Sequence, residues 1–113
     1  MSDYQSAGDL SLAPELMRLA PAEARAFLAL KGAAERADGA IPEKYRELIS
    51  IAVALSTQCG YCIDAHTANA AKAGATRAEI AETVFIAAAL RAGAAVGHGL
   101  LALRLFDANS APE

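Results

Sequence analysis

The chain has 113 residues, which is enough for one domain with a single core and too few for two. Its formal net charge is −3 at pH 7, and its 10 lysines and arginines are scattered singly, so no basic patch suits nucleic acid or an anionic membrane surface. The composition is 55% hydrophobic, much of it alanine, which favours closely packed helices and a homo-oligomer in which other subunits cover part of the apolar surface.

The first segment, residues 1–12, is polar and shows no periodicity, so we expect a flexible or partly ordered N-terminal arm. It lacks the basic start and the apolar stretch of a signal peptide, and the expected compartment is therefore the cytoplasm. Short helices are predicted over residues 14–19 and from Pro21 to about residue 36, because each has a proline in its first turn. Asp38 and Gly39 end the second of these helices.

Two helices are predicted in the middle of the chain, on either side of a break at residues 58–60. The first starts at Pro42 with an acidic first turn and is apolar on most faces up to residue 57. The second runs over residues 61–73 and ends at Gly74, a residue type common just after a helix.

The last predicted helix starts at a capping box of Thr76 and Glu79 and extends to about residue 106, before a polar tail over residues 108–113. Gly93 and Gly97 lie on one face of it, where they either let another backbone approach closely or kink and divide the helix. No segment alternates as a strand does. The predicted fold class is therefore all-α, a compact subunit of about five to six helices with a single domain over residues 13–107.

Residues 83–103 form the only stretch that raises the question of a membrane span. The stretch is long enough, since a span takes about 20 apolar residues. Arg91 falls near its middle, however, where a cation costs ~2.5–3.5 kcal/mol on insertion scales. We therefore expect a buried helix and no membrane partner.

The residues with specific chemistry are two cysteines, Cys59 and Cys62, separated by two residues. This spacing lets a disulfide form across the first turn of a helix, and the free N–H groups at a helix start also stabilise a thiolate. In a reducing cytoplasm such a pair is more often catalytic or metal-binding than structural. The pair is therefore expected to cycle between dithiol and disulfide at the start of the helix over residues 61–73.

Two further residues complete the predicted site. His66 follows Cys62 by four residues, which places both on one helix face, so the imidazole can take and return the thiol proton. Glu47 lies on the preceding helix. If the two helices fold back antiparallel, Glu47 can orient the imidazole or relay a proton through water.

The motif Glu-x11-Cys-x2-Cys-x3-His, followed by Ala-Gly-Ala-Thr-x-x-Glu-Ile and an alanine-rich helix, resembles the alkyl hydroperoxidase D-like proteins of the carboxymuconolactone decarboxylase superfamily. The resemblance implies that Cys62 is oxidised to sulfenic acid, that Cys59 resolves it or supplies a proton, and that Glu47 and His66 form a proton relay. It also implies an all-helical subunit that assembles into trimers or hexamers, a peroxide or disulfide substrate, and a dithiol reductant carried by a lipoylated protein.

Two features depart from that family. Its namesake has a histidine between the cysteines where this chain has Tyr61, so a relay through that position would differ. This chain is also shorter than the namesake, which contains two related helical halves, and a single half is expected to recover the missing contacts by oligomerising. The decarboxylases of the superfamily lack the cysteine pair, which makes decarboxylation the less favoured activity.

Several alternatives stay open. Zinc could bind Cys59, Cys62 and His66 with Asp64 or Glu47, but structural zinc sites usually add a second ligand pair, so no metal or other cofactor is expected. The protein could also be a redox-responsive oligomer that does not turn over substrate. Tyr61 is expected to line the site. His98 either reaches the site of a neighbouring subunit or, as the favoured reading, is a buried histidine with one hydrogen bond.

Overall fold

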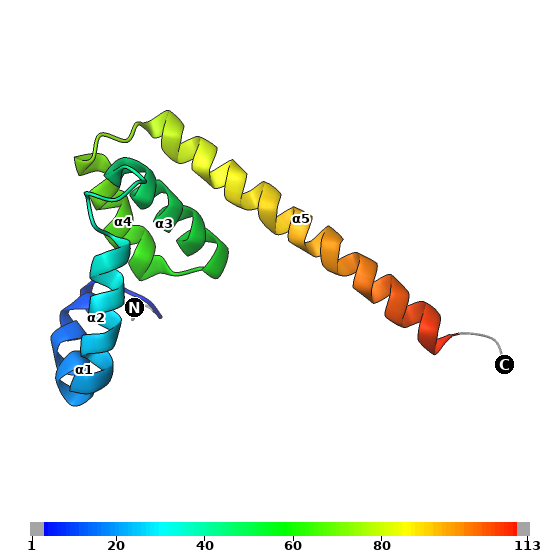
Figure 1. Ribbon diagram of the computed structural model, residues 1–113, viewed down its shortest axis with the longest axis horizontal. Helices are drawn as coiled ribbons and strands as arrows, with labels where there is room; N and C mark the ends of the chain where they lie inside the picture. Colours follow the sequence, from blue (N-terminus) through cyan, green and yellow to red (C-terminus); the bar gives the residue numbers. More distant parts are fainter. Residues whose placement is uncertain (1–3, 111–113) are drawn as a thin grey trace.

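The computed structural model describes residues 4–110, and its regular structure over that range is entirely helical (Figure 1). A 3-10 helix is followed by five α-helices, which in chain order are η1 (Ala7–Leu12), α1 (Ala13–Leu19), α2 (Pro21–Ala34), α3 (Glu43–Thr57), α4 (Gly60–Lys72) and α5 (Arg77–Asn109). The predicted all-α class is confirmed. Part of the expected arm is ordered as η1, because Ser6 and Asp9 form a capping box at its start; residues 1–3 lie outside the described part.

The helix boundaries follow from local signals. Prolines stand in the first turn of α1 and at the start of α2 and α3, where a missing N–H removes no helical hydrogen bond. At the start of α5 the predicted capping box forms, since Thr76 Oγ1 accepts from the Glu79 N–H at 3.1 Å and Glu79 Oε1 accepts from the Thr76 N–H at 2.9 Å.

Helices α3, α4 and the first half of α5 form the packed centre of the subunit, with α3 contacting both others. The buried apolar residues there are Ile51 and three alanines, Ala54, Ala70 and Ala87. Alanine at these contacts lets the helix backbones approach closely, but it buries little apolar area per residue. The core of an isolated subunit is therefore small.

Helix α5 extends well beyond this centre as a single straight rod (Figure 1). The Cα radius of gyration is 19.2 Å, whereas a compact chain of this length would have about 13 Å. The isolated subunit is thus more extended than the compact subunit expected from the sequence, because the second half of α5 contacts no other described element. All residues from 88 to 110 are exposed.

The glycines of α5 neither kink nor divide it, since the helix is continuous through Gly93 and Gly97 to Asn109. A Cβ added at either glycine would meet nothing within 4 Å in this subunit. Of the expected polar tail, residues 108 and 109 belong to the helix, and residues 111–113 lie outside the described part.

Within residues 4–110, α5 is the one helix long and apolar enough to cross a membrane, with a mean hydropathy of 1.6 in its most apolar window. Helices that are buried inside soluble assemblies have the same properties. The buried helix expected over residues 83–103 is not found within this subunit, because its apolar residues are largely exposed, for example Val96, Leu100 and Leu103 at 71%, 70% and 60%. An exposed apolar surface of this kind is typical of a site that contacts another molecule.

Candidate active site

A tight reversal between α3 and α4 builds the site. Gln58 ends α3 in the left-handed conformation, with φ at 58°, and its N–H closes the last turn on the Ala54 carbonyl. The next residue, Cys59, is already the N-cap of α4. The reversal therefore lays α4 antiparallel along α3 and places the cysteine pair at the start of α4.

Cys59 and Cys62 form a disulfide, with their Cα atoms 5.3 Å apart. The Cys59 sulfur accepts a hydrogen bond from the Cys62 N–H at 3.2 Å, so it caps one of the free N–H groups of α4. Both cysteines are half-buried. A sulfur in this position is one whose thiolate would be stabilised by the helix N-terminus after reduction.

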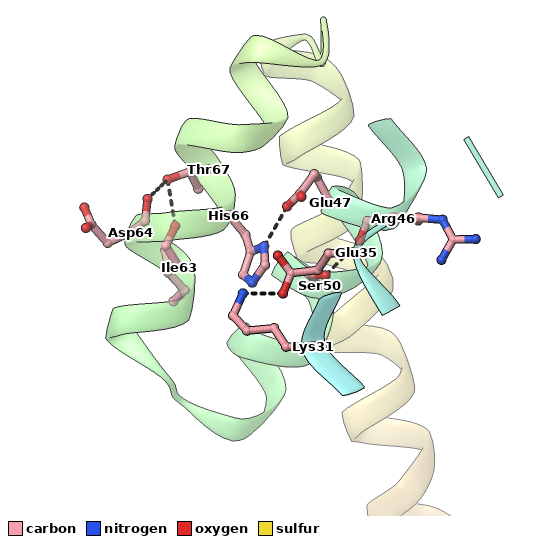
Figure 2. Close-up of polar contacts among 9 residues, drawn as sticks. All are labelled: Lys31, Glu35, Arg46, Glu47, Ser50, Ile63, Asp64, His66 and Thr67. Carbon is pink, nitrogen blue, oxygen red and sulfur yellow. Dashed lines mark hydrogen bonds and ion pairs between the residues drawn. The ribbon is translucent and has the colours of Figure 1, made fainter. Parts of the chain in front are cut away.

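His66 lies one turn further along α4 and faces Glu47 of α3 (Figure 2). The His66 Nδ1 and the Glu47 Oε2 are 2.6 Å apart, and the two side chains are only 13% and 6% exposed. A carboxylate can only accept, so Nδ1 carries the proton and donates a hydrogen bond to Glu47. This arrangement fixes the ring and leaves Nε2 of the neutral imidazole as an acceptor.

A pocket of about 290 Å³ opens between α3 and α4 beside this pair. It is lined by Ile49, Ser50, Val53, Ala54, Thr57, Cys62 and His66. Of the two cysteines, only Cys62 lines it. The pocket thus brings one sulfur of the disulfide and the imidazole to the same small, largely apolar space.

Two residues at the end of α2 and directly after it complete the surroundings of His66, and sequence reasoning missed both. Glu35, just after α2, places a carboxylate oxygen within 4.8 Å of both the Glu47 carboxylate and a ring nitrogen of His66. Lys31, one turn earlier, pairs with Glu35. Figure 2 shows both side chains directed toward the imidazole. No local spacing signals this approach, because α2 and α4 are far apart in sequence.

Arg46 holds the end of α2 in this place. Its Nη1 donates to the Ala34 carbonyl and its Nε donates to the Ile41 carbonyl, each at 2.8 Å. The guanidinium also lies against Gly39, where an added Cβ would fall 1.8 Å from Nη2. The residue before Glu47 thus fixes the loop between α2 and α3, and through it the position of Glu35.

Glu35, Glu47 and His66 are the described residues whose spacing would allow a metal ion. The Lys31 ammonium already neutralises Glu35, and Glu47 is occupied by the imidazole N–H, so this set does not suit a divalent cation. The zinc alternative built on the cysteines does not fit this state, because both sulfurs are in the disulfide and Asp64 lies on the far side of α4 from His66.

The sequence profile of the carboxymuconolactone decarboxylase family matches residues 21–105. The chain belongs to this family. It is 45% identical over 82 residues to "Uncharacterized protein 4 in cox locus" of Paracoccus denitrificans, covering 73% of both chains. It is 35% identical over 91 residues to the protein H16_B0147 of Cupriavidus necator, covering 80% of both.

The carboxymuconolactone decarboxylase fold is also found by structural comparison. A crystal structure of a member of the family from Legionella pneumophila, in its apo form, superposes with a TM-score of 0.66 and 33% sequence identity. The match covers 72% of this chain and 71% of the other. The superfamily to which the cysteine motif pointed is therefore confirmed.

Tyr61 and His98, the two other candidate site residues, lie away from the pocket. The Tyr61 hydroxyl donates to Asp9 Oδ2 of η1 at 2.6 Å, and Tyr61 borders the surface between η1 and α4 rather than the space beside His66. The bond to the carboxylate lowers the pKa of Asp9 and raises the pKa of Tyr61. His98 was expected either to be buried or to reach the site of a neighbouring subunit, and in this subunit it is exposed on the second half of α5.

Proposed function

We propose that this protein is a thiol-dependent peroxidase or disulfide oxidoreductase that cycles the Cys59–Cys62 pair between dithiol and disulfide. One observation carries the proposal: Cys62 shares a pocket with His66, whose Nδ1 is held by the buried carboxylate of Glu47. A redox-capable sulfur and an oriented proton acceptor thus meet in one small space. Family membership supports the fold of the site and leaves the substrate to experiment.

In the proposed reaction, His66 Nε2 takes the proton of the Cys62 thiol, directly or through a water molecule. The thiolate attacks one peroxide oxygen, the O–O bond breaks, and the departing oxygen takes the proton from His66 to leave as an alcohol or as water. The Cys62 sulfur becomes a sulfenic acid. One peroxide has then been reduced by two electrons from one sulfur.

Cys59 completes the cycle. Its thiolate attacks the sulfenic sulfur and displaces hydroxide, which takes a proton to become water, and the disulfide present in the structure results. A disulfide substrate would oxidise the pair by thiol–disulfide exchange instead. In either case an external dithiol reopens the Cys59–Cys62 bond and is itself oxidised, and we propose the lipoyl group of a lipoylated protein for this role.

We further propose that copies of this chain assemble through α5, as a trimer or hexamer in the cytoplasm. The second half of α5 exposes a large apolar surface, while the subunit's own core is small. Arg91 and Arg104 lie on the same helix, and such cations favour a protein cover over a lipid one. Burial of this surface between copies would add the hydrophobic stabilisation that the single subunit lacks.

Steady-state turnover tests the enzymatic proposal. The protein is incubated with hydrogen peroxide or an alkyl hydroperoxide and with dihydrolipoamide, and peroxide loss is followed. We expect many turnovers per subunit in the native protein and none above the uncatalysed rate in Cys62→Ser. A Cys62→Ser rate equal to the native rate would overturn the assignment.

The exposed α5 surface favours one alternative, a redox-responsive oligomer that does not turn over. The same incubation with peroxide and dihydrolipoamide distinguishes the peroxidase from the redox-responsive oligomer. Stoichiometric oxidation of the cysteine pair, together with a change of assembly size on a sizing column, would identify the sensor. Catalytic peroxide consumption without a size change supports the peroxidase.

A further inference from the structure

The surroundings of His66 contain more charge than the proposed reaction uses. Besides Glu47, the Glu35 carboxylate lies within 4.8 Å of the ring, and the Lys31 ammonium pairs with Glu35 on the same side (Figure 2). The Lys31 and Glu35 side chains are 43% and 27% exposed, so they lie between the buried Glu47–His66 pair and solvent. Lys31 lies on the last turn of α2, and Glu35 directly follows that helix.

We propose that Lys31 and Glu35 are positioning residues that set, by their opposed charges, how readily His66 gains and releases its proton. The relevance of this charge balance to catalysis rests on the proposed function. It concerns two residues outside the cysteine motif, and the charge balance itself can be tested without any turnover.

The physical reason is the sum of charges around the ring. A carboxylate within about 4–6 Å favours the protonated imidazole, and a nearby ammonium disfavours it. Glu47 and Glu35 place two carboxylates beside the ring. Lys31 offsets one of the two carboxylates. With His66 protonated the four groups then sum to zero, and with His66 neutral they sum to −1.

The other charged groups near His66 are engaged elsewhere. On α3, the Arg46 guanidinium is directed to the Ala34 and Ile41 carbonyls, away from the ring. On α5, Glu79 pairs with Lys44 of α3 at 2.9 Å.

The remaining neighbours are on α4 and η1. Asp64 points away from the ring on the opposite side of α4, and Asp9 of η1 is bound to Tyr61. Lys31 and Glu35 are therefore the groups whose charge the ring experiences in addition to Glu47 and the cysteine sulfur.

The placement of this pair is built into the fold. Ala34, the residue before Glu35, is bonded through its carbonyl to Arg46, and Arg46 immediately precedes Glu47 on α3. One turn of α3 thus fixes both carboxylates relative to the ring. An accidental surface ion pair would not be anchored in this way to the helix that orients the histidine.

The test compares Glu35→Gln with Lys31→Gln in the full chain, using the NMR titration of the imidazole ring protons. The chain has two histidines, and His98, which lies away from this site on the second half of α5, serves as the internal reference. We expect the His66 titration to move to lower pH in Glu35→Gln and to higher pH in Lys31→Gln, each by roughly half to one pH unit. The double variant should return close to the native curve.

Opposed shifts cannot come from general loosening of α2, which would move both single variants in the same direction. Shifts of one sign, or no shift in either variant, would overturn the inference. The pH dependence of disulfide formation in the reduced protein provides the second readout, and its acidic limb should move with the NMR curve in each variant. Opposed NMR shifts without turnover would contradict the proposed function alone, whereas turnover with unchanged titration would contradict this inference alone.

Discussion

Glu47 Oε2 lies 2.6 Å from His66 Nδ1 across the interface of α3 and α4, and both side chains are almost fully buried. A buried charge of this kind is tolerated when it is hydrogen-bonded. Among the described residues no buried side-chain nitrogen or oxygen lacks a partner. The pair therefore holds the imidazole in one orientation and one tautomer, with Nε2 free to accept a proton from the pocket that Cys62 lines.

Replacing Glu47 tests this orientation. In Glu47→Gln the amide has nearly the same shape but can donate to Nδ1, which favours the tautomer with the proton on Nε2. We expect the rate of peroxide-driven disulfide formation to fall by roughly 10- to 100-fold. Stopped-flow oxidation of the reduced protein measures it. The exposed Glu43→Gln on the same helix is the control, and equal rates in the two variants would remove Glu47 from the mechanism.

Gly39 tests the anchoring of α2 by Arg46. A methyl group at Gly39 would fall 1.8 Å from the Arg46 Nη2, so in Gly39→Ala the guanidinium must move and its bonds to the Ala34 and Ile41 carbonyls weaken. We expect faster hydrogen exchange over residues 31–36 and a lower Tm. The Glu47–His66 bond should persist, because it does not involve α2.

The matched control lies within the same helix. Gly32 is in the interior of α2 and an added Cβ there would meet nothing within 4 Å. Gly32→Ala should therefore stabilise the protein by about 0.5–1 kcal/mol through helix propensity. If both alanine variants change Tm in the same direction, steric displacement of Arg46 is not the reason.

The bond between Tyr61 and Asp9 predicts a pH window for the docking of η1 on α4. Tyr61 has its pKa raised above its ordinary 10.0, so its contribution is lost as pH rises through that higher value. Asp9 has its pKa lowered below its ordinary 3.8, so its contribution is lost as pH falls through that lower value. The stabilisation from this contact should be constant between the two ordinary pKa values, 3.8 and 10.0, and should decline outside them.

Asp9→Asn tests this contact directly. Without the carboxylate, the pKa of Tyr61 should fall back toward its ordinary value, as measured by the NMR titration of its ring carbons. The remote Asp107→Asn on α5 should leave the Tyr61 titration unchanged. A Tyr61 pKa that is identical in the native protein and in Asp9→Asn would show that the two side chains are not bonded in solution.

The exposed face of α5 predicts self-assembly. Val96 and Leu100 lie one turn apart and are about 70% exposed. Replacing both with lysine places two charges in the proposed interface, and we expect a lower assembly mass in analytical ultracentrifugation together with a lower Tm. Asn109→Lys at the end of the same helix is the control. An unchanged assembly mass in the double variant would exclude this face.

Much of the fold follows from local signals in the sequence. The prolines at the starts of α2 and α3, the Thr76–Glu79 capping box and the break at residues 58–60 all predicted helix boundaries that the structure shows. The extent of α5 beyond the core was not predictable, because the sequence of an apolar helix does not show whether its own subunit or another one covers it.

The same distinction holds for the site, where contacts within one helix were predictable and contacts between helices were not. The spacing of Cys59, Cys62 and His66 predicted neighbours on one helix, since those contacts are local. Glu47 required a guess about how α3 and α4 pack. Glu35 could not be found, because its approach to His66 depends on the contact between Arg46 and Ala34, which are 12 residues apart and share no recognisable motif.

The most direct test of the proposed role of Cys62 is to trap its oxidised sulfur. In Cys59→Ser, treated with one equivalent of peroxide and a sulfenic-acid reagent, mass spectrometry identifies the modified residue and stopped-flow gives the rate. We expect an adduct on Cys62 that forms more slowly when Glu47→Gln is added. No adduct on Cys62, or a rate that Glu47→Gln leaves unchanged, would contradict it.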